Sequence, residues 1–346
     1  MKDYITNSPI FVVGTSRSGT TLLNTILNEH SDVGLPSKET HYFDDLRLKM
    51  RGHQQKSLSP EQAKRCQDYF LTLTHKDYDT GGDPEQGWMD RTQLQTLAES
   101  LGSSSDCYFE AFCRLCAQQD NKTRWGEKTP RHVFPITEIL TRYPNAQVVC
   151  MLRHPGGVIL SYRNFWRTKI TDRDEQLRLQ NSYNIVLACL LWKAAFNTAL
   201  KARKQFGEER IYIQRFEDLI TEPESAIKTL TAWLGLNYQS SMKEVPLTNS
   251  SYSEFQEKAG FSKEPIYRWR KELSETEIAA VQYFCGSLLK EAGYEPEPIT
   301  ASLGLISWLW LTLPFGLLQA VFANSQRMGN IPQYIWQRFR LAVLQK

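Results

Sequence analysis

Short apolar runs alternate with longer amphipathic stretches over the first 240 residues or so. The apolar runs at 11–13, 147–152 and 210–214 are rich in β-branched residues and predict strands. Apolar positions at helical spacing predict helices over 20–27, 155–162, 183–205 and 223–236, with a mainly helical stretch over 59–117. Strands that alternate with helices are typical of a parallel sheet covered by helices, so the pattern predicts an α/β fold.

The first predicted strand runs directly into a glycine-rich turn, Gly14-Thr-Ser-Arg-Ser-Gly-Thr-Thr21. Such a turn before a helix directs backbone N–H groups and the positive end of the helix dipole at one point, where a phosphate binds. The spacing of Gly14 and Gly19 is that of a P-loop, but Thr20 replaces the lysine that reaches the β- and γ-phosphates of ATP. Arg17 is the one cation inside the loop. The sequence therefore predicts a P-loop-type three-layer fold that binds a nucleotide-like anion other than magnesium ATP.

Two further groups of polar residues follow predicted elements. Arg153 comes directly after the strand at 147–152, and Ser161 lies two helical turns later, so the pair could hold a second phosphate. Glu39 and His41 are the titratable residues nearest in sequence to the loop, and either could take a proton from a hydroxyl nucleophile. The simpler alternative for each of these residues is an ordinary solvated surface group.

Several segments, in a fixed order between Pro9 and Tyr294, resemble the sulfotransferase family. The donor of that family is 3′-phosphoadenosine-5′-phosphosulfate (PAPS). Lys38–Asp44 and Glu127–Pro130 are similar to the heparan-type branch, so the chain resembles the heparan-type and tyrosylprotein-type branches more closely than the cytosolic phenol type. The other segments that carry the resemblance are Phe11–Leu22, Val149–Tyr162, Arg215–Leu219 and Tyr267–Leu273.

The resemblance implies in-line transfer of a sulfuryl group from PAPS to an acceptor hydroxyl, without a metal. It implies Glu39 as the general base, with His41 as the alternative base. Arg17, where many members carry lysine, would stabilise the leaving phosphate, and Lys128 would lie near the sulfuryl group. Phe216 replaces a tyrosine near the adenine. The implied donor contacts are Gly14, Thr15, Ser16, Arg17, Ser18, Gly19, Thr20, Thr21, Arg153, Ser161, Phe216 and Arg268.

The C-terminal part contains an uncharged apolar segment, 303–323, that is long enough to cross a bilayer. A simple span with its basic end inside would place the preceding domain outside the cytoplasm. That orientation conflicts with a donor made in the cytosol and with an N-terminus that lacks an apolar signal segment. Acidic Glu295 and Glu297 precede the segment, and the basic residues that follow it are Arg327, Arg338, Arg340 and Lys346.

A monotopic arrangement resolves this conflict. Pro314 is expected to break the apolar segment into two short halves, and 331–344 is expected to form an amphipathic helix at an anionic membrane surface. The alternative is a helical pair that packs on the catalytic domain or on a partner subunit. We therefore expect a catalytic domain over 1–298 and a membrane-directed or interface extension over 299–346. The expected location is the cytoplasmic side of a membrane, or otherwise the cytoplasm.

Composition limits the remaining choices. A formal net charge of +3 is too small to indicate a nucleic-acid-binding protein. Seven cysteines, with a single CxxC pair at Cys113 and Cys116, predict buried thiols of a reducing compartment. Acceptor pockets are expected on the loops within 47–120 and 168–183, and a glycan or glycolipid at a membrane is one possible acceptor. The rival functions are a P-loop kinase and a catalytically inactive nucleotide-fold adaptor.

Overall fold

The computed structural model of this protein describes residues 8–78, 80–167, 172–245 and 261–328. Its centre is a five-stranded sheet in the order β2-β3-β1-β4-β5, with every pair of neighbouring strands parallel. The α/β fold expected from the sequence is confirmed. The strands are β1 (Ile10–Gly14), β2 (Val33–Gly34), β3 (Arg124–Lys128), β4 (Gln147–Leu152) and β5 (Ile211–Arg215).

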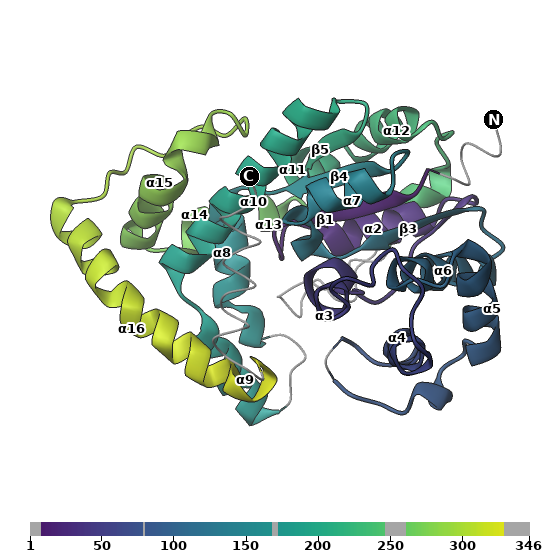
Figure 1. Ribbon diagram of the computed structural model, residues 1–346. Coiled ribbons are helices and arrows are strands. Elements are labelled where there is room, and N and C mark those ends of the chain that lie inside the picture. Colours follow the sequence, from purple (N-terminus) through teal and green to yellow (C-terminus); the bar gives the residue numbers. More distant parts are fainter. Residues whose placement is uncertain (1–7, 79, 168–171, 246–260, 329–346) are drawn as a thin grey trace.

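Helices cover both faces of the sheet and extend to one side of it (Figure 1). The helices predicted over 20–27, 155–162, 183–205 and 223–236 are present, and the stretch over 59–117 contains three α-helices. In chain order the helical elements are α2 (Thr20–Asn28), η1 (Tyr42–Leu46), α3 (Arg47–Lys49), α4 (Pro60–Leu73), η2 (Pro84–Gln86), α5 (Arg91–Leu101), α6 (Ser105–Gln119), η3 (Pro130–Val133), α7 (Ile136–Arg142), α8 (Pro155–Arg163), η4 (Phe165–Arg167), α9 (Arg173–Ser182), α10 (Ile185–Phe206), α11 (Phe216–Thr221), α12 (Pro223–Leu234), η5 (Ser240–Lys243), α13 (Glu264–Tyr267), α14 (Trp269–Glu272), α15 (Glu275–Leu289) and α16 (Leu303–Met328).

The alternation of side chains along β1 separates two hydrophobic cores. Phe11 and Val13 pack into an aromatic-rich core with α4, α6 and α7. Ile10 and Val12 point to the opposite face and pack with α2 and α12. A third core joins α8, α10, α14 and α15 beside the sheet. The carboxyl ends of β1 and β4 lead into α2 and α8, so both predicted anion-binding segments lie at one edge of the sheet.

The seven cysteines are all free thiols, and six of them are buried. Cys113 is buried on α6 and Cys116 is partly buried one turn later. The expectation of buried thiols is confirmed.

The C-terminal apolar segment differs from the expectation in one respect. α16 runs without interruption from Leu303 to Met328 with Pro314 inside it, so the prediction of two short halves was wrong. A proline removes one helical hydrogen bond, and Leu309 and Leu313, which both precede it, pack on the third core and anchor this half of the helix. The amphipathic helix expected over 331–344 lies outside the described residues.

Two of the described helices are long and apolar enough to cross a membrane. One is α10, which packs in the third core and has 44% of its most apolar stretch buried in the molecule. The other is the Leu303–Ala323 part of α16, no residue of which is fully buried.

Candidate active site

The turn between β1 and α2 has room for glycine alone at two positions. Gly14 has φ of 148°, and a Cβ atom there would collide with the carbonyl oxygen of Met151 on β4. Gly19 has φ of 99°, and a Cβ atom there would lie 2.5 Å from the ring of Phe216. Close approach of β4 and α11 therefore fixes both glycines of the motif.

The N-terminus of α2 is open toward the turn. Gly19 is its N-cap, and among the described residues no side chain caps it. The hydroxyl of Ser18 instead donates a hydrogen bond of 2.6 Å to the carbonyl of Thr15, which closes the loop on itself. The first backbone N–H groups of α2 are thus available to an anion, and the helix dipole favours one.

Arg17 joins the two predicted anion-binding segments. Its backbone is left-handed, with φ of 70°, and its Nε donates a hydrogen bond of 3.0 Å to Oγ of Ser161 on α8. Arg153 in turn donates a hydrogen bond of 3.1 Å to the carbonyl of Arg17. Burial and the neighbouring charge of Arg153 lower the pKa of Arg17 to about 10. A bound anion would favour the charged form of both guanidinium groups and reduce the repulsion between them.

Arg153 is held by residues from three separate parts of the chain. Its guanidinium lies 4.5 Å from the ring centre of Phe216 and donates a hydrogen bond of 3.1 Å to the carbonyl of Pro265. Its own carbonyl accepts a hydrogen bond of 2.9 Å from the indole of Trp192 on α10. The predicted donor contact Arg268 directly follows α13, three residues after Pro265. Its guanidinium pairs with Glu272.

A histidine that the sequence reasoning did not select lies beside Arg153. His154 caps α8 by accepting a hydrogen bond of 3.1 Å from the N–H of Gly156, and its ring stacks on Trp269 with the centres 4.2 Å apart. Burial and the charges of nearby arginines lower the pKa of His154 to about 3. The ring is therefore neutral and serves to align α8 with α14.

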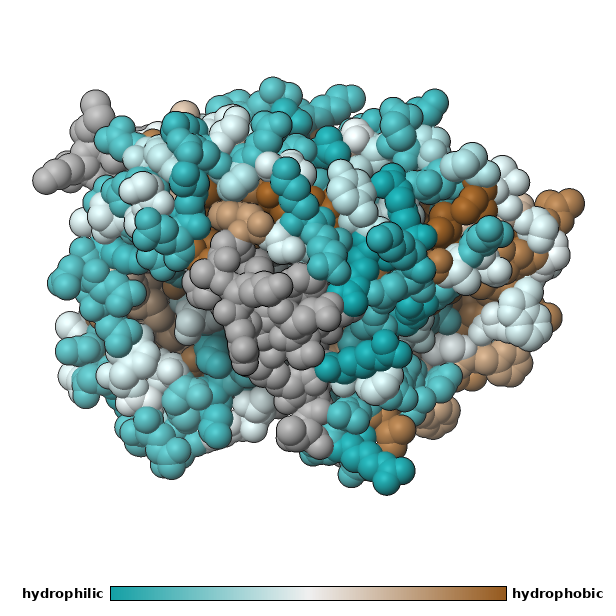
Figure 2. Space-filling model, turned by 180° about the vertical axis from the view of Figure 1, so that it is seen from behind, coloured by the Kyte–Doolittle hydropathy of each residue, from teal (hydrophilic) through white to brown (hydrophobic). Residues whose placement is uncertain are grey.

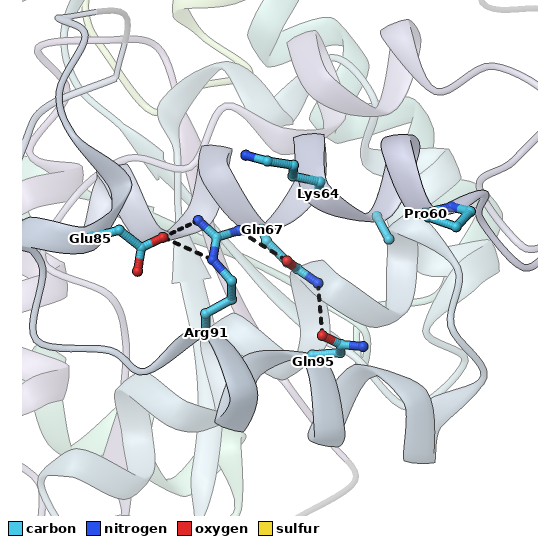
Figure 3. A pocket seen from close by; sticks show the side chains of 7 residues that line it. Pro60, Lys64, Gln67, Glu85, Arg91 and Gln95 are labelled. Atoms are coloured by element: carbon cyan, nitrogen blue, oxygen red, sulfur yellow. Dashed lines mark hydrogen bonds and ion pairs between the residues drawn. The ribbon is translucent and has the colours of Figure 1, made fainter.

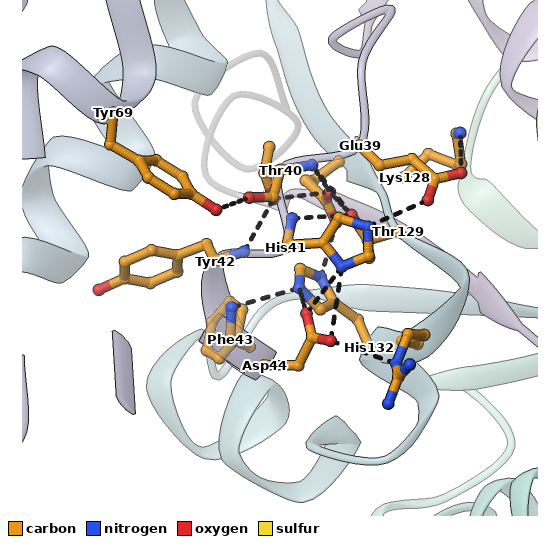
Figure 4. A network of polar contacts seen from close by, with 12 residues as sticks. Glu39, Thr40, His41, Tyr42, Phe43, Asp44, Tyr69, Lys128, Thr129 and His132 are labelled. Atoms are coloured by element: carbon orange, nitrogen blue, oxygen red, sulfur yellow. Dashed lines mark hydrogen bonds and ion pairs between the residues drawn. The ribbon is translucent and has the colours of Figure 1, made fainter. Parts of the chain in front are cut away.

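The predicted bases lie on the segment between β2 and η1. Oε1 of Glu39 accepts a hydrogen bond of 2.7 Å from Nζ of Lys128 at the end of β3, and Oε2 lies 3.3 Å from Nε2 of His41 (Figure 4). Nδ1 of His41 lies 3.1 Å from Asp44, so the imidazole bridges two carboxylates. The three predicted residues Glu39, His41 and Lys128 are thus brought together.

These contacts change the proton affinity of both candidate bases. Burial alone would raise the pKa of Glu39, but the hydrogen bond from His41 and the charge of Lys128 outweigh it and lower that pKa to about 2. Burial alone would lower the pKa of His41, but the carboxylates of Asp44 and Glu39 outweigh it and raise that pKa to about 9. At neutral pH the arrangement is a carboxylate, an imidazolium and a second carboxylate in a row.

A buried polar network underneath fixes the left-handed backbone of His41, whose φ is 46°. Glu127 on β3 accepts hydrogen bonds from Thr40 at 2.8 Å and from Thr129, and lies 2.8 Å from Nδ1 of His132. Thr129 also accepts a hydrogen bond of 3.3 Å from the backbone of His41. The sequence reasoning noted the segment that contains Glu127 and Thr129, but it assigned them no role.

A family model described as the sulfotransferase family matches residues 9–240. This chain belongs to the sulfotransferase family.

Two known proteins show the extent of the likeness. Nodulation protein NoeE of Sinorhizobium fredii is 24% identical over 301 residues, which are 82% of this chain and 65% of NoeE, so the match spans less than two thirds of that relative. The sulfotransferase domain of the Synechococcus PCC 7002 olefin synthase is 20% identical and has a TM-score of 0.52, over 83% of this chain and 95% of that domain. At this identity the second likeness concerns the fold alone.

Sulfotransferases use PAPS as the sulfuryl donor, and the residues of this chain fit such a ligand. The turn that requires Gly14 and Gly19 leaves its backbone N–H groups accessible, and Arg17 and Arg153 bring two positive charges to the same edge of the sheet. PAPS has no γ-phosphate, which is consistent with Thr20 in place of the P-loop lysine.

A surface hollow of about 410 Å³ lies elsewhere in the sulfotransferase fold, between α4 and α5 (Figure 3). Arg91 crosses it and donates hydrogen bonds of 2.9 Å to Glu85 and 3.0 Å to Gln67. The hollow contains none of the residues described above, although it lies within the 47–120 segment expected to carry acceptor loops. Its lining residues are Pro60, Ala63, Lys64, Gln67, Glu85, Arg91 and Gln95.

Proposed function

We propose that this chain transfers the sulfuryl group of PAPS to an acceptor hydroxyl by in-line displacement, with Glu39 as the general base. The observation that carries the proposal is the proximity of the base to the donor turn. Nζ of Lys128 donates a hydrogen bond of 2.7 Å to Glu39, and Lys128 pairs in register with Val12 on β1, two residues before Gly14. A base held by the strand next to an anion-binding turn would contact the acceptor oxygen as that oxygen attacks the sulfuryl group.

The donor-binding role falls to the β1–α2 turn and the start of α8. The backbone N–H groups that follow Gly14, together with Arg17, would stabilise the negative charge that develops on the leaving phosphate. Arg153 and Ser161 would hold the 3′-phosphate, and Phe216, which packs against Arg153 and Gly19, would support the adenine side. PAPS supplies the sulfuryl group in this scheme.

The two candidate bases have different protonation states, and this favours Glu39. His41 is already protonated at neutral pH because Asp44 and Glu39 flank it, so it orients Glu39 rather than accepting a proton. Glu39 is ionised but weakly basic while Lys128 donates to it. When Lys128 shifts toward the sulfuryl oxygens, Glu39 loses a hydrogen bond and a nearby charge, and its basicity rises as the acceptor arrives.

The proposal also covers the class of acceptor and the location of the protein in the cell. Exposed apolar residues on α16 support an acceptor that a membrane presents, such as a glycan or glycolipid, with the catalytic domain on the cytoplasmic side. The division into a catalytic domain at 1–298 and an extension at 299–346 belongs to the same proposal. Closeness to the heparan-type branch remains a prediction.

Calorimetric titration of 3′-phosphoadenosine-5′-phosphate into the detergent-solubilised full chain tests the donor site. We expect micromolar binding without added metal, and a loss of about tenfold or more in Arg153→Ala because a charge-assisted hydrogen-bond donor is removed. Arg114→Ala is the matched control, because Arg114 pairs with Glu110 on α6 and should leave binding unchanged. Absence of binding by the wild-type chain would overturn the proposal, and binding of magnesium ATP instead would favour the kinase alternative.

A further inference from the structure

The outer face of α16 is a continuous apolar stripe. Trp308, Leu311, Phe315 and Leu318 follow one another at intervals of three and four residues, so they share one side of the helix. Their exposed fractions are 62%, 67%, 70% and 54%. Figure 2 shows apolar side chains along the edge of the molecule where α16 lies, at the right of that view. A contiguous exposed patch of this kind marks an interaction surface.

The inner face of α16 is held by the neighbouring helices along its length. Near its start, Leu309 and Leu313 pack on the third core. Gly316 permits close approach to Asn184, the N-cap of α10, because a Cβ atom there would collide with the Asn184 amide. Farther on, Gln319 donates a hydrogen bond of 3.0 Å to Asn181 at the end of α9.

The last described turn of α16 also binds α9. Asn324 donates a hydrogen bond of 2.7 Å to Ser182 and accepts one from Arg178. α9 carries Arg173, Asp174 and Glu175 in its first turn as well. If α16 crossed a bilayer in this arrangement, these charges would enter the hydrocarbon, which is strongly unfavourable. The packing of α16 on α9 is therefore compatible with a helix that lies along a membrane surface.

We infer that α16 docks in the plane of an anionic bilayer, with its outer stripe in the lipid and its inner face on α9. This inference deepens the membrane-presented acceptor of the proposed function and rests on it. Charge complementarity favours a bilayer over a second copy of the chain, because residues 303–346 include four basic side chains and no acidic one. Trp308 and Trp310 are the residue type that prefers the interface between headgroups and acyl chains.

The docked face is linked to the donor turn through three successive contacts. The guanidinium of Arg17 lies 4.6 Å from the ring centre of Phe165 on η4. η4 packs against α9, and α9 packs against α16. A bilayer on the outer stripe would therefore present hydroxyl groups of its own amphiphiles on the side of the molecule that carries η4. The acceptor class that fits is a membrane-resident amphiphile with a hydroxyl-bearing headgroup.

Vesicle co-sedimentation of the full chain tests the docking surface. We expect binding to vesicles of phosphatidylcholine and phosphatidylglycerol at about 7:3, and weaker binding to phosphatidylcholine alone. Trp308→Glu and Phe315→Glu should each lower the partition coefficient by about tenfold or more. Trp88→Glu is the matched control, because Trp88 is an exposed aromatic residue, 44% accessible, on the segment after η2.

Titration of 3′-phosphoadenosine-5′-phosphate into the same variants separates this inference from the proposed function. Unchanged nucleotide binding with lost vesicle binding supports the docking surface. Absence of nucleotide binding by the wild-type chain would overturn the proposed function, while the vesicle measurements would still test the docking surface. Equal vesicle binding by Trp308→Glu, Phe315→Glu and wild type overturns the docking surface, and so does a dimer that dissociates in these variants, which would assign the stripe to a second copy.

Spin labels at Trp308→Cys and Phe315→Cys distinguish docking from spanning. The two positions are seven residues apart, about 10 Å along a helix axis. A helix in the membrane plane places both labels at the same shallow depth. A depth difference of about 10 Å would overturn the in-plane arrangement.

Discussion

Glu39 has three charged neighbours, and its proposed role as the general base depends on which of them it keeps during the reaction. Lys128 and His41 both hold its carboxylate, and Arg17 lies within range of its charge. A residue so strongly held is poorly basic until a neighbour moves. The separation of roles among Glu39, His41 and Lys128 can therefore be tested with single substitutions.

Glu39→Gln should lower the turnover of sulfuryl transfer by about 10²- to 10⁴-fold, because the amide cannot accept the acceptor proton. The substitution keeps the size of the side chain, so affinity for 3′-phosphoadenosine-5′-phosphate should stay within about twofold of wild type. Radiolabelled sulfate transfer and calorimetry measure the two quantities. Glu138→Gln is a suitable control because Glu138 is a partly exposed carboxylate that pairs with Arg47 on α3. Near-normal turnover in Glu39→Gln would show that another residue is the base.

At the scale of elements, the sequence predicts β1, β4 and β5 well because each is an apolar run. It does not predict β3, whose residues Arg-Trp-Gly-Glu-Lys read as a polar loop. All five residues of β3 are buried, and its polar side chains have partners there. The Arg124 guanidinium donates a hydrogen bond of 2.7 Å to the carbonyl of Ser8, and Glu127 is bound by Thr40 and His132. Those partners come from distant parts of the chain, so no local pattern of hydrophobicity reveals this strand.

The β1–α2 turn gives a prediction about backbone strain. Gly14→Ala should lower the free energy of unfolding by about 1–3 kcal/mol, because φ of 148° and the nearby carbonyl of Met151 leave no space for a Cβ atom. Gly286→Ala is the matched control on α15, where a Cβ atom would meet nothing within 4 Å, and it should be neutral or stabilising by up to about 1 kcal/mol. Urea denaturation measures both values. Equal stability of the two variants would contradict the proposed tightness of the turn.

At the scale of the molecule, the sequence predicts that both anion-binding segments meet, because the carboxyl ends of parallel strands share one edge. It does not predict what completes that edge. Pro265 contacts Arg153 and Trp269 stacks on His154, and both lie far from these residues in sequence and reach them through packing of α13 and α14 on α8. The sequence does not predict the orientation of α16 either, because the contacts of its inner face depend on the position of α9.

The stability of the whole molecule should depend on pH through His41 and Glu39. The pKa of His41 is raised to about 9, so its contribution is complete below about pH 6.5 and is lost as pH rises toward 9. The pKa of Glu39 is lowered to about 2, so its contribution is complete above about pH 4.5 and is lost as pH falls toward 2. Urea denaturation between pH 6 and pH 9.5 should show decreasing stability for wild type, with a smaller decrease for His41→Gln. Equal decreases in the two proteins would contradict the raised pKa.

The hydrogen bond from Arg153 to Pro265 also has a consequence for how the protein is made. It joins residues 112 positions apart in the chain. Ribosomes add roughly 5–20 residues per second, so Pro265 is synthesised on the order of ten seconds after Arg153. The sheet can form in that interval, because its last strand, β5, ends at Arg215. If Arg153 binds the donor as proposed, full nucleotide affinity is expected only after α13 has been synthesised, late in translation.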